Sequence, residues 1–170
     1  MMVESIFTYP RLIGYLLKRM EDSYPDKQIG KTIVQKMMYL LTREGTVDFN
    51  YSMYHYGPYS SEVSGELNFA SSSGIVDINW VDDKGYFIKS TQKLENFENL
   101  LTDQDKQVID ELVKKFGRFN ANELSLIATA FFLKDNFNVS DVRLAEVVHN
   151  AKPKYPYKSI EIVLQKAGIL

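Results

Sequence analysis

The spacing of apolar residues divides the chain into a mixed first half and a helical second half. Up to residue 45, apolar side chains recur every three to four positions, which is the period of a helix with one buried face. Two helices are predicted there, the first opened by Pro10 and the second running from about Gly30 to Glu44, where Gly45 ends it. Their buried faces are predicted to hold Leu12, Ile13, Leu16, Leu17 and Met20, and Ile33, Val34, Met37, Met38 and Leu41.

Alternating polar and apolar positions replace this period after residue 45. A strand is predicted to end at Gly57-Pro58, because Gly57 can adopt a positive φ and a proline disfavours a helical conformation at the residue before it. A short helix follows, with Ser60 or Ser61 free to cap it. The strand, the helix and the two strands of a hairpin after it are predicted over 47–56, 61–73, 75–81 and 86–91.

The remainder of the chain is predicted to be helical. Thr102 is followed by Asp105 three residues later, a spacing that resembles a capping box and predicts the start of a helix. Further helices are predicted to begin at Asn120 or Asn122, at Ser140 and at Ser159.

These elements predict a mainly helical α+β protein. The order helix, helix, strand, helix and two-stranded ribbon indicates a winged-helix-like half over residues 1–92, and an all-helical half over residues 93–170 is expected to pack on it. Because no Gly/Ser-rich linker separates the two halves, we expect them to share one core.

Charge and composition narrow the range of functions. The net charge of −2 produces no overall attraction to nucleic acid or to an anionic membrane. The chain contains no cysteine, which excludes disulfides, thiolate metal sites and a cysteine nucleophile. The first residues lack the basic and apolar segments of a signal peptide, and no apolar run reaches about 18 residues. We expect a soluble cytoplasmic protein, either a monomer or a homodimer.

The sequence contains no pattern that indicates catalysis, a cofactor or a metal site. His55 and His149 lie far apart, neither belongs to a cluster with the spacing of metal ligands, and His55 is predicted to be packed within an aromatic strand. Gly30-Lys31-Thr32 resembles the end of a phosphate-binding loop, but Pro25 stands where that loop needs a glycine. We expect a protein that is not an enzyme.

DNA binding is the function that a winged helix suggests, and the charges argue against it. In such folds the helix after the turn enters the major groove and supplies Arg, Lys, Asn or Gln. The corresponding helix here, residues 61–73, carries Glu62 and Glu66 and no Lys or Arg. Residues 46–92 contain two lysines and six acidic residues, a net charge of −4 that phosphate would repel. A protein-binding regulatory module is therefore favoured, with a winged-helix DNA-binding transcriptional regulator as the alternative.

An aromatic surface is the predicted binding site for a protein partner. Gln35, Lys36 and Tyr39 lie on one side of the second helix, and the residues around Gly57-Pro58 join them if strand and helix pack together. Tyrosines are enriched at binding hot spots. The predicted partner-binding residues are Gln35, Lys36, Tyr39, His55, Tyr56, Gly57, Pro58 and Tyr59. The alternative is that Tyr39, Tyr54 and Tyr56 are core residues and that Gln35 satisfies a buried backbone group.

A second candidate site interleaves lysines with tyrosines near the C-terminus. Lys152, Lys154, Tyr155 and Lys158 could contact an anion or a nucleic acid by charge and by stacking. The alternative is a solvated loop whose tyrosines pack on neighbouring helices.

Three short motifs carry a resemblance to known families. They are Gln35-Lys36-x-x-Tyr39-Leu40, Tyr56-Gly57-Pro58-Tyr59-Ser60 and Gly74-Ile75. Their spacing is similar to that of the uncharacterised YwgA-like proteins of bacteria and archaea and, more distantly, to the Panacea (SocA-like antitoxin) domain. Residues 124–133 and Lys152-Pro153-Lys154 resemble the C-terminal segment of the YwgA-like group. The resemblance implies a non-enzymatic regulatory or interaction protein, such as an adaptor or an antitoxin-like neutraliser.

Overall fold

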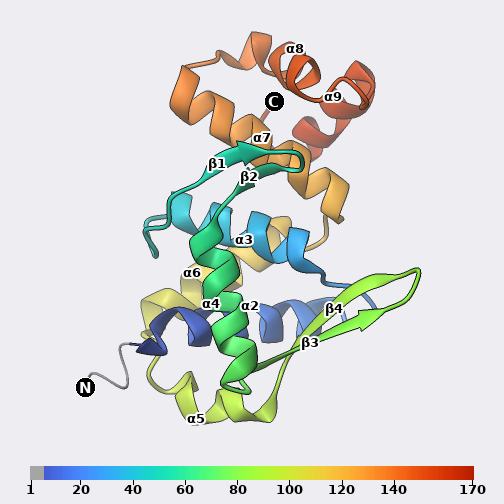
Figure 1. Cartoon of the computed structure of the whole chain (residues 1–170). Coiled ribbons are helices and arrows are strands. Elements are labelled where there is room, and N and C mark those ends of the chain that lie inside the picture. The colour runs from blue at the N-terminus through green and yellow to red at the C-terminus, as the bar shows by residue number, and fades with distance from the viewer. Residues whose placement is uncertain (1–5) are drawn as a thin grey trace.

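The computed structural model describes residues 6–170, and helices dominate it (Figure 1). The predicted mainly helical α+β class is confirmed. Residues 8–90 form three helices and two antiparallel hairpins, in the order α2 (Thr8–Ser23), α3 (Lys31–Arg43), β1 (Ser52–Tyr54), β2 (Gly57–Tyr59), α4 (Ser61–Ser72), β3 (Val76–Val81) and β4 (Gly85–Ser90). The helical elements that follow are η1 (Gln92–Leu94), α5 (Glu95–Glu98), α6 (Asp103–Phe116), α7 (Ala121–Phe137), α8 (Asp141–Ala151) and α9 (Tyr157–Lys166).

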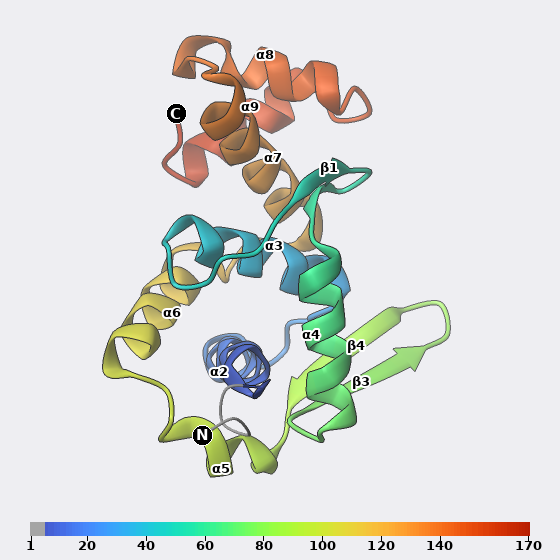
Figure 2. The same cartoon turned by 60° about the vertical axis from the view of Figure 1, so that its left-hand side comes forward.

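Helix α2 lies at the centre of the larger part of the molecule. Figure 2 looks nearly along its axis and shows α3, α4, α5 and α6 arranged around it, with the β3–β4 hairpin on one side. All five residues of its predicted apolar stripe are buried: Leu12, Ile13, Leu16, Leu17 and Met20. Gly14 allows close packing, because a Cβ there would lie 2.8 Å from Leu94 Cδ1 and 2.9 Å from Ile75 Cγ2.

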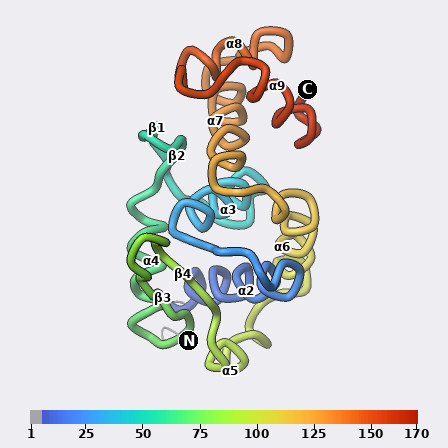
Figure 3. The backbone as a smooth tube through the Cα atoms, turned by 90° about the vertical axis from the view of Figure 1, so that its right-hand side faces the viewer, coloured from blue at the N-terminus to red at the C-terminus, as the bar shows by residue number. Residues whose placement is uncertain are grey.

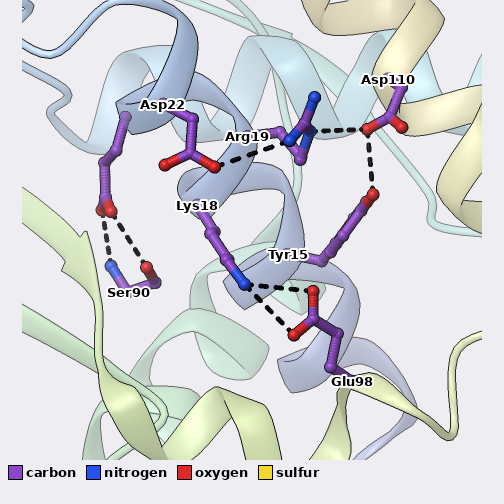
Figure 4. Close-up of polar contacts among 8 residues, drawn as sticks. Tyr15, Lys18, Arg19, Asp22, Ser90, Glu98 and Asp110 are labelled. Carbon is purple, nitrogen blue, oxygen red and sulfur yellow. Dashed lines mark hydrogen bonds and ion pairs between the residues drawn. The ribbon is translucent and has the colours of Figure 1, made fainter.

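Polar side chains on the outer surface of α2 connect it to three neighbouring segments (Figure 4). The Tyr15 hydroxyl donates to Asp110 of α6 at 3.0 Å, and Arg19 forms an ion pair with the same carboxylate at 2.9 Å. Lys18 pairs with Glu98 at 3.2 Å, and Ser90 donates to the carboxylate of Glu21. Because these groups are partly exposed, each pair contributes less than about 1 kcal/mol, and the buried stripe provides most of the stabilisation.

Helix α7 joins the central bundle to the two last helices. Figures 1 and 3 show α7 rising from the end of α6, with α8 and α9 packed at one end of the molecule. One face of α7 contacts α3 and strand β2, and its buried segment runs from Leu124 to Ala130. The buried apolar residues of all these elements form one continuous cluster. The division into halves at residue 92 stays a prediction.

The segment before Gly57-Pro58 differs from the predicted strand over residues 47–56. Only Ser52–Tyr54 is a strand, and it pairs with Gly57–Tyr59 in a small hairpin, so Pro58 lies opposite Met53 instead of within a turn. A proline is tolerated in this two-stranded ribbon because both strands are edge strands. The predicted positive φ at Gly57 is confirmed at 99°, where it ends the turn of the hairpin. The predicted cap is also confirmed, since the Ser60 side chain accepts from the Val63 amide.

Most helix ends agree with the capping signals. Thr102 caps α6, and Asn120 forms a full capping box with Glu123 at the start of α7. Ser140 occupies the N-cap position of α8, but its side chain makes no capping hydrogen bond.

Two features of the second half were not predicted. The last helix begins at Tyr157, directly after Pro156, instead of at Ser159. The short elements η1 and α5 had no periodic signal, because they have three and four residues and each completes only about one helical turn.

Candidate functional site

The β1–β2 hairpin presents its tip to solvent. Tyr54 is 62% exposed and Tyr56 57% exposed, and His55 between them is also exposed. The Tyr54 ring contacts the rings of His55 and Tyr59, each at a centroid distance of 5.4 Å. A hairpin with strands of three residues is not stable by itself in water. Its conformation therefore depends on contacts with the rest of the protein.

Two buried side chains of α3 bind the backbone of strand β2 and of the residue after it. The amide of Gln35 donates to the Ser60 carbonyl at 2.8 Å and accepts from the Ser60 N–H at 3.0 Å. The amine of Lys36 donates to the Pro58 carbonyl at 2.8 Å. Gln35 is 6% exposed and Lys36 2% exposed, so both groups act in the protein interior. Together they supply the hydrogen bonds that a third strand would supply in a larger sheet.

A third anchor comes from the loop after α8. The amine of Lys152 donates to the His55 carbonyl at 2.9 Å, and Lys152 is 7% exposed. The adjacent Lys154 places its amine 5.7 Å from the centre of the Tyr56 ring. The two candidate sites predicted separately from the sequence, the hairpin and the Lys152–Lys158 segment, therefore meet at the hairpin tip.

The two anchoring amines raise an electrostatic problem. Among the ion pairs of residues 6–170, none involves Lys36 or Lys152, so carbonyl oxygens alone solvate these ammonium groups within the protein. Burial and the nearby charge of Lys152 lower the pKa of Lys36 to about 8. Burial and the charge of Lys154 lower the pKa of Lys152. The site therefore holds positive charge that no carboxylate of the described chain neutralises.

Gly57 lets the hairpin approach α7 closely. A Cβ at this position would lie 2.8 Å from the Thr129 hydroxyl and 3.2 Å from the Ser125 carbonyl. Both α7 residues are buried, so neither has open space in which to move away. Gly57 is thus required twice, for its positive φ and for its lack of a side chain.

Three hollows meet at Tyr56, which lines all of them. The first, of about 400 Å³, lies between α3, the hairpin and α4 and has an apolar wall that includes Val34, Val63 and Leu67. The second, of about 1020 Å³, lies between the segment before α3, the β3–β4 turn and the start of α7. The third, of about 430 Å³, lies between the hairpin tip and residues 151–154.

The residues predicted to bind a partner fall into a buried and an exposed group. Gln35, Lys36, Tyr39, Gly57 and Pro58 are buried, so their binding role stays a prediction while their structural contacts are evident. Tyr39 packs on Tyr51 and Phe132, and burial raises its pKa. The exposed or half-exposed group is His55, Tyr56 and Tyr59.

Two interpretations from the sequence are corrected at the hairpin tip. The packed position expected for His55 is wrong, and so is the alternative that placed Tyr54 and Tyr56 in the core. Both expectations assumed a longer strand lying along α3. Because the strand is short and turns at Tyr54 to Gly57, these rings project beyond the helices.

Only some of the C-terminal candidate residues contact the hairpin. Lys152 and Lys154 contact the hairpin, and Tyr155 is half-buried with its hydroxyl donating to Asn122 at 3.1 Å. Lys158 lies on α9 and binds Glu161 at 2.9 Å, so it does not join the hairpin tip through its amine.

Sequence reasoning missed the cations that line the second hollow. Lys31, Lys84 and Arg118 come from the start of α3, the β3–β4 turn and the loop before α7. No local pattern connects residues that are more than 30 positions apart in the sequence. The fold alone brings them together.

Comparison with known proteins identifies one family. The family described as "Antitoxin SocA-like, Panacea domain" matches residues 33–131, which begin within α3, include both hairpins and end within α7. Gln35, Lys36 and Gly57 lie within the match, and Lys152 lies outside it. No curated protein matches the chain. The likeness to YwgA-like proteins stays a prediction.

The described residues form neither a metal-binding cluster nor a membrane-spanning helix. Within residues 6–170, no group of three or more His, Cys, Asp or Glu residues is arranged to hold a metal ion. None of the helices described is both long and apolar enough to cross a bilayer.

Replacement of Gly57 by alanine should destabilise the protein more than the same change at Gly45. Both glycines have a positive φ, but a Cβ at Gly45 would meet no atom within 4 Å. We expect Gly45→Ala to cost about 1 kcal/mol of unfolding free energy from backbone strain, and Gly57→Ala to cost about 1–3 kcal/mol more from the contact with α7. Urea denaturation measures both values, and equal losses would contradict the close packing of the hairpin on α7.

The stability contributed by Lys36 should depend on pH. Its pKa of about 8 in the folded protein is below the ordinary 10.5, so above pH 8 the unfolded chain binds more protons at this residue than the folded protein does. Folding stability must therefore rise with pH in this range, relative to a variant that cannot titrate there. We expect wild type to gain about 2 kcal/mol over Lys36→Met between pH 7.5 and pH 9.5. Urea denaturation at several pH values measures this gain, and parallel pH profiles would contradict the lowered pKa.

Proposed function

The chain belongs to the SocA-like Panacea domain family, and on that premise we propose that it is a non-enzymatic protein that acts by binding a protein partner. Its role is that of an antitoxin-like neutraliser or an adaptor. The observation that supports this proposal best is the exposed aromatic tip of the β1–β2 hairpin, held in place by buried side chains.

An anchored aromatic tip has the properties of a protein-binding surface. Tyrosine supplies a large contact area and a polar hydroxyl, and it is enriched among the residues that dominate binding energy. The backbone beneath Tyr56 is already bound at His55, Pro58 and Ser60 by side chains from other elements. Such preorganisation lowers the entropy lost on binding, since the loop does not have to be ordered by the partner.

The charges near α4 favour a protein partner over duplex DNA. Helix α4 carries Glu62 and Glu66 and no Lys or Arg, and the turn between β3 and β4 contains Asp82 and Asp83. Either element would bring carboxylates against phosphate if it entered a groove of DNA. The winged-helix transcriptional regulator is therefore the weaker alternative.

Truncation of Tyr56 should weaken partner binding without unfolding the protein. The partner is first captured from the source cells on the immobilised full chain and is then purified for titration. We expect Tyr56→Ala to weaken the Kd about 10- to 100-fold, while the Tm changes by no more than about 2 °C because the ring is largely exposed.

Phe137→Ala is the matched control. Phe137 is 66% exposed and ends α7, sixteen residues beyond Ala121, which lines a hollow with Tyr56. Phe137 lies eight residues, or about 12 Å along the helix axis, beyond Thr129, the α7 residue that faces Gly57. The control should bind like wild type. Equal affinities for wild type and Tyr56→Ala, or an equal loss in both variants, would refute the proposed surface.

A further inference from the structure

We propose that the partner segment bound at Tyr56 is an acidic stretch of polypeptide that carries apolar anchor residues. This inference rests on the proposed function and specifies the chemistry of the partner. It depends on the distribution of charge around the three hollows, which differs from that of the whole chain.

The lining of the hollows is strongly basic although the chain has a net charge of −2. Among residues 6–170, Asp26 is the single acidic residue that lines them. Seven basic residues line the same hollows: Lys27, Lys31, Lys36, Lys84, Arg118, Lys152 and Lys154. A concave surface lined by one sign of charge concentrates the electrostatic field and attracts the opposite charge.

These cations have no carboxylate partners within the part of the chain that the structure describes. Every ion pair among residues 6–170 lies elsewhere and uses other lysines and arginines. Lys36, Lys152 and Lys27 bind backbone carbonyls, the last of them at Gly117 and Phe119. Lys31 lies 4.1 Å from the centre of the Tyr86 ring. A carboxylate brought by a partner could therefore pair with the exposed Lys31, Lys84 or Lys154 without displacing an existing ion pair.

The first and second hollows adjoin each other, which indicates how such a segment lies. Lys31, Thr32 and Tyr56 line both of them. The first hollow offers the exposed or half-exposed rings of Tyr54, Tyr56 and Tyr59 to a leucine-like or aromatic side chain. The second offers Lys84 and Arg118 for carboxylates. A segment with an apolar anchor next to Asp or Glu residues fits both.

A nucleic acid fits this surface less well. Its phosphates would gain from the second hollow, but the apolar wall of the first offers them nothing. The neighbouring α4 carries Glu62 and Glu66, and Asp82 and Asp83 directly precede Lys84 in the β3–β4 turn. A strand long enough to bind by phosphate neutralisation would approach these carboxylates.

A peptide selection tests the inference on the full chain. A random library of displayed 12-residue peptides is selected against the immobilised protein, and the enriched peptides are synthesised and titrated by fluorescence anisotropy. We expect enriched peptides to combine Asp or Glu with Leu, Phe or Tyr, and their Kd to weaken steeply with added salt. The charge-reversal variant K31E/K84E should weaken their binding at least tenfold.

The variant K89E/K106E is the matched control. It makes the same change in net charge, and neither Lys89 nor Lys106 lines any of the three hollows. Its Kd should stay within twofold of wild type. A 20-residue DNA or RNA probe is titrated in parallel.

Each other outcome overturns the inference. No enriched peptide, enrichment without an acidic excess, or undiminished binding to K31E/K84E would show that the surface does not select acidic segments. If the DNA or RNA probe bound more tightly than the selected peptides, and K31E/K84E abolished that binding, nucleic acid would be the occupant. The first three results would not refute the proposed function, because the titration of Tyr56→Ala with the captured partner tests it separately.

Discussion

The candidate binding surface depends on a buried ammonium group bound to a backbone carbonyl. Lys36 places its amine 2.8 Å from the Pro58 carbonyl, and the neighbouring Gln35 completes two hydrogen bonds with Ser60. Burying these side chains would cost free energy if they lacked hydrogen-bond partners, and the same holds for the buried backbone groups of Pro58 and Ser60. The two side chains and the backbone groups satisfy one another. The position of three exposed rings is therefore decided inside the protein, at residues that no partner needs to touch.

This arrangement also determines the charge of the surface. Carbonyl oxygens solvate the amines of Lys36 and Lys152 but carry no net negative charge, so the positive charge persists next to the hollows. Burial and the nearby Lys152 lower the pKa of Lys36 inside the protein, and an attraction for acidic partner segments is the effect that we propose at the surface. A carboxylate in place of the Pro58 carbonyl would form an ion pair with the amine of Lys36 and would remove both effects. One interaction thus connects the stability of the hairpin to the proposed selectivity of the protein.

Local signals in the sequence predicted much of the fold. The stripe from Leu12 to Met20 and the cap at Ser60 were predicted correctly, because periodicity and capping depend on residues within a few positions of one another. The positive φ of Gly57 followed from the same kind of local argument.

The site depends on contacts between distant residues, and there sequence reasoning was less successful. Lys36 was predicted to lie on a binding surface, but it is buried, which is rare for a lysine. Nothing in the sequence near Lys36 indicates that its amine donates to the Pro58 carbonyl. Lys152 binds a carbonyl 97 residues away. The strand expected over 47–56 was too long because alternation alone does not show where pairing begins. The binding role predicted for the aromatic residues stays a prediction.

The central claim is that a protein partner lies against the hairpin tip, and site-specific photo-crosslinking tests it most directly. A photoreactive phenylalanine analogue is placed at position 56 in one variant and at position 137 in another, and both are irradiated in the source cells. We predict a crosslinked polypeptide of one discrete mass from position 56, and none from position 137. Equal crosslinking from the two positions, or crosslinking of position 56 to nucleic acid alone, would contradict it.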